Sequence, residues 1–177
     1  MNSMSRGYNQ NCGKEKRREE EKEYCPTIIK CGCPGAVTIP TTAEVGNTFT
    51  IASLTLDNSC LCDPITRLEF TSNVIASEGT EVGAFNIQVF KQYRNQVNAI
   101  PVGPSWSYST TTGPSSQTFS FFICDSDSCY NECCTYTVVA TVVTVPGGAA
   151  ININNATLGA ITTCKSNACS RKCEKNY

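Results

Sequence analysis

Hydrophobic and polar residues alternate along most of the chain between residues 26 and 164, and this two-residue period is typical of β-strands with one buried face. In residues 84–93 every second side chain falls on one face, and these side chains are Phe85, Ile87, Val89, Lys91 and Tyr93. Residues 135–145 are apolar on both faces, which predicts a strand in the middle of a sheet. We find no segment with the period of a helix that packs on a core.

This pattern predicts seven to nine strands. They are expected at residues 27–31, 36–40, 48–57, 66–76, 84–93, 117–124, 135–145 and 149–164, the last as one strand or two. Between Ile51 and Leu54 the alternation shifts by one residue, which predicts a β-bulge. Residues 101–116 are rich in Pro, Gly and Ser and are predicted to form the longest loop. Such spacing predicts an all-β protein with a single antiparallel β-sandwich, jelly-roll-like in its connections.

Three regions follow from this pattern. Residues 1–25 include the run GKEKRREEEKE, which has no apolar stripe, and they are predicted to be an extended, Cys-bearing N-terminal arm. Residues 26–164 are the expected Cys-rich sandwich, and residues 165–177 are a short polar and basic C-terminal tail.

Charge is distributed unevenly along the chain. Residues 1–30 carry seven Lys and Arg against five Asp and Glu, and residues 164–177 carry four against one. Residues 31–163 carry three against nine, so an acidic body lies between two basic ends. This distribution disfavours a nucleic-acid partner and favours head-to-tail contact between copies of the chain.

The residue types argue against an enzyme. The chain has no His, which is the commonest general base and the usual partner of a catalytic Cys. We find no GxSxG, P-loop or dinucleotide-binding motif, and Glu69, Glu78 and Glu81 are expected to be solvated. We therefore predict no catalytic residue and no cofactor.

The 13 cysteines raise a question about the cellular location. The first 24 residues show no apolar core of a signal peptide, which predicts synthesis in the cytoplasm. No apolar run is long enough to span a bilayer, and no membrane partner is expected. A reducing cytoplasm and a high cysteine content conflict unless the protein is later released or its thiols bind metal.

Two Cys-x-Cys pairs, Cys31/Cys33 and Cys60/Cys62, lie next to expected strands. Residues i and i+2 of a strand share a face at a distance of about 6.6–6.8 Å, so a bond within either pair would be strained. A single spacer is also awkward for a tetrahedral zinc site, and a redox motif needs a helix N-terminus. Each pair is therefore expected to bond to another strand or another molecule, with metal binding and free thiols as alternatives.

The adjacent Cys133 and Cys134 would face opposite sides of a strand, so one can pair inward while the other faces a neighbour. A hairpin pinned by one local disulfide is the alternative. Asp125 and Asp127 resemble part of a calcium loop but lack its Gly and its distal Glu, so we assign no metal site. The odd total of cysteines indicates at least one thiol that is left over or pairs between molecules.

Six cysteines, in the arm, the tail and the doublet, are candidates for intermolecular disulfides: Cys12, Cys25, Cys133, Cys134, Cys169 and Cys173. Seven more are candidates for bonds within the sandwich or between subunits: Cys31, Cys33, Cys60, Cys62, Cys124, Cys129 and Cys164. Their connectivity is not determined by the sequence.

The segments KCGCPG (residues 30–35) and LTLDNSCLC (residues 54–62) resemble motifs of uncharacterised Cys-rich proteins of spore-forming clostridia, over about residues 29–164. A charged, Cys-bearing arm ahead of a Cys-rich all-β domain is similar to the subunits of bacterial endospore appendages. The resemblance implies a jelly-roll subunit whose arm cysteines bond to sandwich cysteines of neighbours in a helical fibre. Cys12 and Cys25 lie in the comparable arm, but the doublet typical of that arm occurs here in the body, at residues 133–134.

The resemblance also implies synthesis in the mother cell and release when that cell lyses, which explains a Cys-rich protein without a signal peptide. The expected function is therefore structural. The protein would be a self-assembling subunit of a disulfide-cross-linked fibre or coat at the spore surface, its partners being copies of itself and other spore-surface proteins. One alternative is a monomeric module that binds carbohydrate or a host surface through Trp106 and Tyr108 in the predicted loop. For these two residues, a loop that packs against its own sheet is expected ahead of a binding role. A second alternative is a metal-binding protein that uses the Cys-x-Cys pairs.

Overall fold

The computed structural model describes residues 25–77, 79, 81–94, 96–129 and 133–165. These residues form the strands β1 (Ile28–Cys31), β2 (Gly35–Ile39), β3 (Thr48–Asp57), β4 (Pro64–Ala76), β5 (Ala84–Tyr93), β6 (Ile100–Ser109), β7 (Ser115–Asp125), β8 (Cys133–Thr144) and β9 (Ile151–Cys164). The protein is all-β, as predicted, and none of the described segments forms a helix that could cross a membrane.

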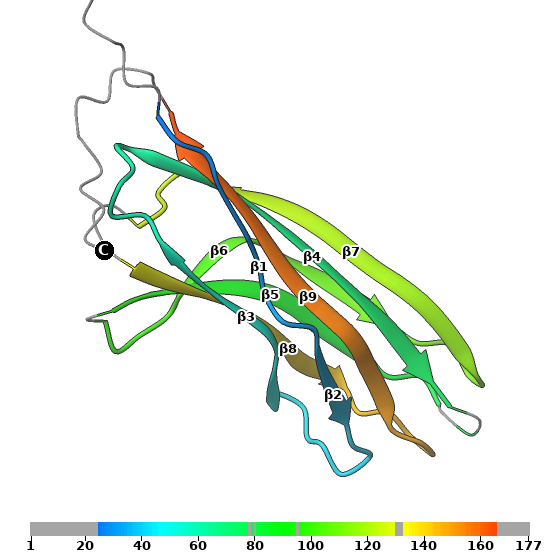
Figure 1. Cartoon of the computed structure of the whole chain (residues 1–177). Helices are drawn as coiled ribbons and strands as arrows, with labels where there is room; N and C mark the ends of the chain where they lie inside the picture. The colour runs from blue at the N-terminus through cyan, green and yellow to red at the C-terminus, as the bar shows by residue number, and fades with distance from the viewer. Residues whose placement is uncertain (1–24, 78, 80, 95, 130–132, 166–177) are drawn as a thin grey trace, which may run out of the picture.

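The strands form two antiparallel sheets that face each other as a sandwich (Figure 1). The five-stranded sheet has the order β1-β9-β4-β7, and β2 also pairs with β9. The four-stranded sheet has the order β3-β8-β5-β6. Because β1 pairs with residues 159–162 of β9 and β2 with residues 151–156, these two short strands follow one another along a single edge of β9.

The core lies between the two sheets and consists of the residues that the alternation placed on the inner face. In β5 the side chains of Phe85, Ile87, Val89 and Lys91 are buried, as the sequence predicted. In β8, which lies between β3 and β5, every second residue from Cys134 to Val142 is buried. Each large apolar side chain buried in this way stabilises the fold by about 1.5–3 kcal/mol.

Two local predictions are confirmed in this part of the fold. The pairing of β3 with β8 shifts between Thr50 and Ala52, which is the expected bulge, and it allows Ile51 and Ala52 to be buried together. The last predicted segment forms one strand, β9, rather than two.

The predicted long loop at residues 101–116 is wrong, because residues 100–109 form β6 and β7 begins at Ser115. β6 lies at the edge of its sheet, where a Pro removes no hydrogen bond to a second neighbour, so Pro101 and Pro104 are tolerated. Gly103 adopts a left-handed φ of +69° near the point where the pairing with β5 changes register. The Pro, Gly and Ser content therefore marked an irregular edge strand rather than a loop.

Candidate functional site

Cys25 and Cys164 form a disulfide within the chain, with their Cα atoms 5.9 Å apart. The register of β1 on β9 explains the bond, because Ile28 pairs with Thr162 and this pairing brings residue 25 next to residue 164. Cys25 was expected to bond to another molecule, and the structure instead uses it to join the first strand to the last. A bond that closes a loop this long, with a sequence separation of 139, contributes on the order of 4–5 kcal/mol in the chain-entropy description.

A second disulfide joins Cys129 to Cys134, only five positions apart. Cys134 was also expected to bond outside the molecule, but it points into the core and is buried. Its neighbour Cys133 faces the other side of β8 and is half-buried and unpaired. This arrangement matches the predicted alternative of a hairpin pinned by one local disulfide.

Cys133 lies opposite Asp57 of β3. The pKa of Asp57 lies below its ordinary value, mainly because the side chain and backbone N–H of Ser59 donate hydrogen bonds to it; a weaker hydrogen bond from Cys133 acts in the same direction.

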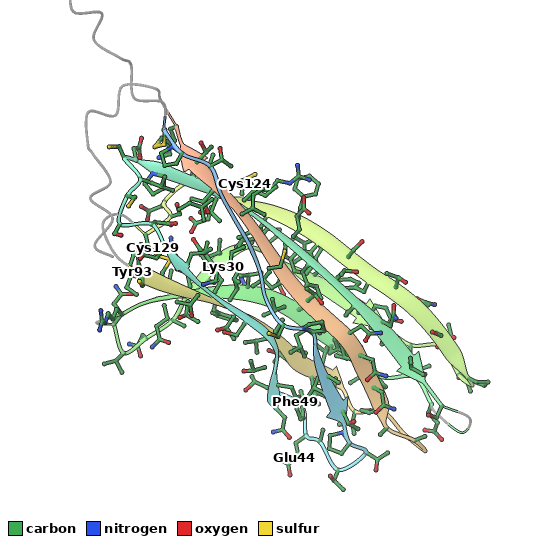
Figure 2. All side chains as sticks on the ribbon, viewed as in Figure 1. Lys30, Glu44, Phe49, Tyr93, Cys124 and Cys129 are labelled. Carbon is green, nitrogen blue, oxygen red and sulfur yellow. A yellow bond between two sulfur atoms is a disulfide. The ribbon has the colours of Figure 1, made fainter. Side chains whose placement is uncertain are left out.

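The two Cys-x-Cys pairs do not bond to each other. Cys31 and Cys33 are exposed and unpaired, whereas Cys62 takes part in a disulfide and Cys60 has an interaction partner of its own. Cys124, near the end of β7, is a third exposed and unpaired thiol. The remaining candidates, Cys12, Cys169 and Cys173, lie outside the described residues. Cys124 and Cys129 both lie toward one end of the sandwich, far from Glu44 at the other end (Figure 2).

The outer face of the five-stranded sheet, which is the side turned away from the other sheet, carries two of these thiols. The pairing registers define two neighbouring rows across it: Ile29, Ile161, Arg67 and Cys124 in one row, and Cys31, Gly159, Glu69 and Phe122 in the other. Cys31 and Cys124 therefore lie on the same face, at opposite edges of the sheet, in adjacent rows.

This outer face carries three exposed large apolar side chains. Ile29, Phe122 and Ile161 are 71%, 62% and 41% exposed. Arg67 forms an ion pair with Glu69 at 2.9 Å, and its guanidinium lies 4.7 Å from the centre of the Phe122 ring. A hollow of about 480 Å³ opens beside these side chains. Exposed apolar groups rimmed by charge are typical of contact surfaces.

The inner face of the same sheet carries a buried ion pair. Lys91 of β5 donates to both carboxylate oxygens of Asp125 of β7, at 2.9 and 3.2 Å, and both side chains are about 5% exposed. The hydroxyl of Tyr136 donates to the same carboxylate at 2.7 Å, and Lys91 also donates to the backbone carbonyl of Asp127. Burial, followed by the charge of Asp125, raises the pKa of Tyr136 well above its ordinary value. The pair joins the two sheets.

The aromatic pair Trp106 and Tyr108, which the binding-module alternative needs on the surface, packs against the protein instead. Trp106 is half-buried and stacks on Phe121 at 4.0 Å between ring centres, while Tyr108 is buried and donates to Gln117. Among the described residues, Phe122 is the exposed aromatic side chain, and no prediction from the sequence had singled it out. The doublet Phe121-Phe122 was the available signal, because adjacent residues of a strand must face opposite sides.

Within the described part of the chain, no group of three or more Cys, Asp and Glu side chains lies close enough to hold a metal ion. The carboxylate of Asp125, which resembled part of a calcium loop, is bound by Lys91 and Tyr136 instead.

Two antiparallel sheets, disulfides within the chain and unpaired surface thiols define a disulfide-bonded β-sandwich protein. The chain belongs to the family described as a domain of unknown function, DUF4489, which matches residues 25–163. None of the curated proteins compared with the chain matches it. The disulfides indicate an oxidising, extracellular setting.

Several solved structures are similar in fold at low sequence identity. A structure of the infectious bursal disease virus Gx strain is 13% identical, with a TM-score of 0.49, over 82% of this chain and 33% of that one. A carbohydrate-binding module of the β-sandwich superfamily is 13% identical, with a TM-score of 0.36, over 73% of this chain and 55% of that one. The Eiger TNF of S. frugiperda is 8% identical, with a TM-score of 0.42, over 83% of this chain and 99% of that one. The chain thus spans a third to about half of the first two proteins.

Proposed function

We propose that the protein is a structural subunit that assembles with copies of itself into a disulfide-cross-linked fibre or coat at the spore surface. The observation that carries the proposal is the contrast among its cysteines. Cys25, Cys129, Cys134 and Cys164 are bonded within the chain, whereas Cys31, Cys33 and Cys124 are exposed and unpaired. Under conditions that oxidise the first group, exposed thiols on neighbouring molecules bond to one another.

Covalent joining changes how such an assembly resists dissociation. A non-covalent contact is lost on dilution by mass action, whereas a disulfide between copies has to be broken by a reductant. When two copies of the chain meet through two different patches, the contact is head-to-tail. Repetition of this contact builds an open filament if the rotation from one copy to the next does not close a ring.

The N-terminal arm, residues 1–25, supplies a second contact in this proposal. We expect it to add to a sheet edge of a neighbouring subunit as an extra strand, which a disulfide then locks. In the described residues the outermost strands are β3 and β6 of one sheet, and β7 together with β1 and β2 of the other. The spore-surface location rests on the resemblance to appendage subunits and on the oxidising setting that the disulfides indicate.

Electron microscopy of the purified full chain with and without reductant tests the proposal. We expect filaments or sheets that survive denaturant without reductant and run as a ladder of covalent multimers on a non-reducing gel. A protein that stays monomeric on that gel after oxidation is not a disulfide-cross-linked subunit. Removal of residues 1–25 also removes one partner of the Cys25–Cys164 bond, so the arm is tested better by deletion of residues 1–24. This deletion should leave a folded sandwich that polymerises poorly.

A second function is favoured by the hollow beside Phe122. An exposed ring flanked by the charged pair Arg67 and Glu69 has the composition of a carbohydrate-stacking site. Binding of a glycan by a monomeric protein, lost in Phe122→Ala and kept in Trp106→Phe, would favour the binding module over the structural subunit.

A further inference from the structure

We infer that copies of the chain join edge to edge through the five-stranded sheet, with β7 of one copy beside β1 of the next, and that a disulfide between Cys124 and Cys31 closes this joint. The inference rests on the proposed function and assigns to it one contact surface and one bond. Its starting point is that the two exposed thiols of the outer face lie on the two opposite edge strands of one sheet.

Strand direction allows the joint without turning a subunit over. Each neighbouring pair in the order β1-β9-β4-β7 is antiparallel, so β7 runs opposite to β1. A copy placed beside another in the same orientation therefore presents its β1 antiparallel to the β7 of its neighbour. The two sheets can then continue into one hydrogen-bonded sheet, and the contact is head-to-tail and open-ended.

The register places both thiols on the same side of the continued sheet. Cys124 lies in the row of Ile29, and Cys31 lies in the next row, two residues away along the strand. A step of two residues per copy, about 6.6–6.8 Å, sets Cys124 opposite Cys31 of the next copy. Because the step is even, outer faces stay continuous with outer faces, whereas an odd step would turn one thiol toward the core side.

The geometry of an antiparallel pair suits a disulfide. Residues directly opposite each other have Cα atoms about 4.5 or 5.5 Å apart, and disulfides span about 4.4–6.8 Å. In this register Phe122 lies opposite Cys33 of the next copy, and Ile29 of the next copy lies diagonal to Cys124. These apolar side chains, 62% and 71% exposed in the single chain, thus flank the bond and are partly covered by it.

The same bond cannot form within one molecule. Three strand spacings of about 4.7–4.9 Å separate β1 from β7, and the two residues also lie in different rows, so Cys31 and Cys124 are more than about 14 Å apart, at least twice the reach of a disulfide. A covalent link between these two residues is therefore a direct marker of contact between copies.

Oxidation of the joint needs an external oxidant, and we assign this role to a low-molecular-weight disulfide. The Cys124 thiolate attacks that disulfide, releases one thiol and becomes a mixed disulfide. The Cys31 thiolate of the next copy then attacks the Cys124 sulfur and releases the second thiol. Two cysteine thiols are oxidised, and one small disulfide is reduced to two thiols.

The test uses the full chain, assembled in oxidised and reduced glutathione, with Cys31→Ser, Cys33→Ser, Cys124→Ser and Cys133→Ser as variants. Non-reduced digests are analysed by mass spectrometry, with fragmentation to locate the bonded sulfur atoms. We expect a peptide pair linked through Cys31 and Cys124 in the wild type. The link should be lost in the Cys31 and Cys124 variants and kept in the Cys33 and Cys133 variants, whose thiols take no part in the expected bond. Circular dichroism checks that each variant folds.

The outcomes separate this inference from the proposed function. A covalent ladder that persists in Cys124→Ser, with bonds through other cysteines, overturns the joint but leaves a cross-linked structural subunit. A bond between Cys124 and Cys33 overturns the two-residue register. A chain that stays monomeric after oxidation overturns both the joint and the proposed function.

Discussion

The two faces of the five-stranded sheet are built from the same strands but carry opposite chemistry. In β7 the inner face presents Ile123 and the buried carboxylate of Asp125, whereas the outer face presents Phe122 and the thiol of Cys124. Because side chains alternate along a strand, one short segment serves the core and the surface at once. The inner positions should therefore control stability, and the outer positions should control contact with other molecules.

The buried ion pair gives the largest expected difference between the faces. Asp125→Ala leaves the Lys91 ammonium buried without its partner, and this should lower the free energy of unfolding by about 3–5 kcal/mol. Urea unfolding monitored by circular dichroism measures the change. The double variant Lys91→Met with Asp125→Leu is the control, because it removes both charges and should be much less damaging. If the single and double variants lost equal amounts of unfolding free energy, the unpaired charge of Lys91 would not be the cause.

Two Phe residues of neighbouring strands allow the two faces to be compared with the same substitution. Phe70→Ala removes an inner ring that is 2% exposed, and this should cost about 3–4 kcal/mol through lost burial and the cavity left behind. Phe122→Ala removes an outer ring that is 62% exposed, and it should cost less than about 1 kcal/mol in the monomer. Chemical denaturation of both variants under monomeric conditions gives the comparison. A large loss of stability in Phe122→Ala would show that the outer face also supports the fold.

The cysteines extend the comparison to covalent bonds. Cys129→Ser opens the short disulfide to the buried Cys134, and the loop-entropy description gives a loss of about 2 kcal/mol. Cys124→Ser changes an exposed thiol and should leave the melting temperature of the monomer unchanged while reducing covalent multimers. Calorimetry and a non-reducing gel on the same samples measure both quantities. The prediction fails if Cys124→Ser is the less stable variant.

The smallest effect near neutral pH is expected at Tyr136. Its pKa is raised by burial and by the charge of Asp125, so the folded state keeps the phenol proton at a pH where the unfolded chain loses it. Stability should therefore fall as pH rises above about 10, the ordinary pKa of tyrosine. The measurement is the free energy of unfolding between neutral pH and this range, on protein whose free thiols have been alkylated. This free energy should fall more steeply with pH for the wild type than for Tyr136→Phe. Parallel pH profiles would contradict the assignment.

The sequence predicted much of the framework because its signals are local. The alternation in residues 84–93 located β5 and its buried face, and the shift after Ile51 located the bulge in β3. The prediction was wrong at residues 101–116, where Pro and Gly are also tolerated by an edge strand. The strand order decides whether a strand has one neighbour or two, and this order cannot be predicted from residue composition alone.

Pairing between distant residues depends on how the strands associate. Lys91 was correctly placed among apolar side chains, but its partner Asp125 lies on the opposite sheet. Cys25 and Cys164 are 139 residues apart and meet only because β1 pairs with β9. The sequence by itself determined every strand except β6, the buried faces of these strands and the excess of thiols, since a two-residue period needs only neighbouring residues. The tertiary structure decided which thiols close within the chain and which stay on the sheet edges, because strand order and register depend on long-range packing.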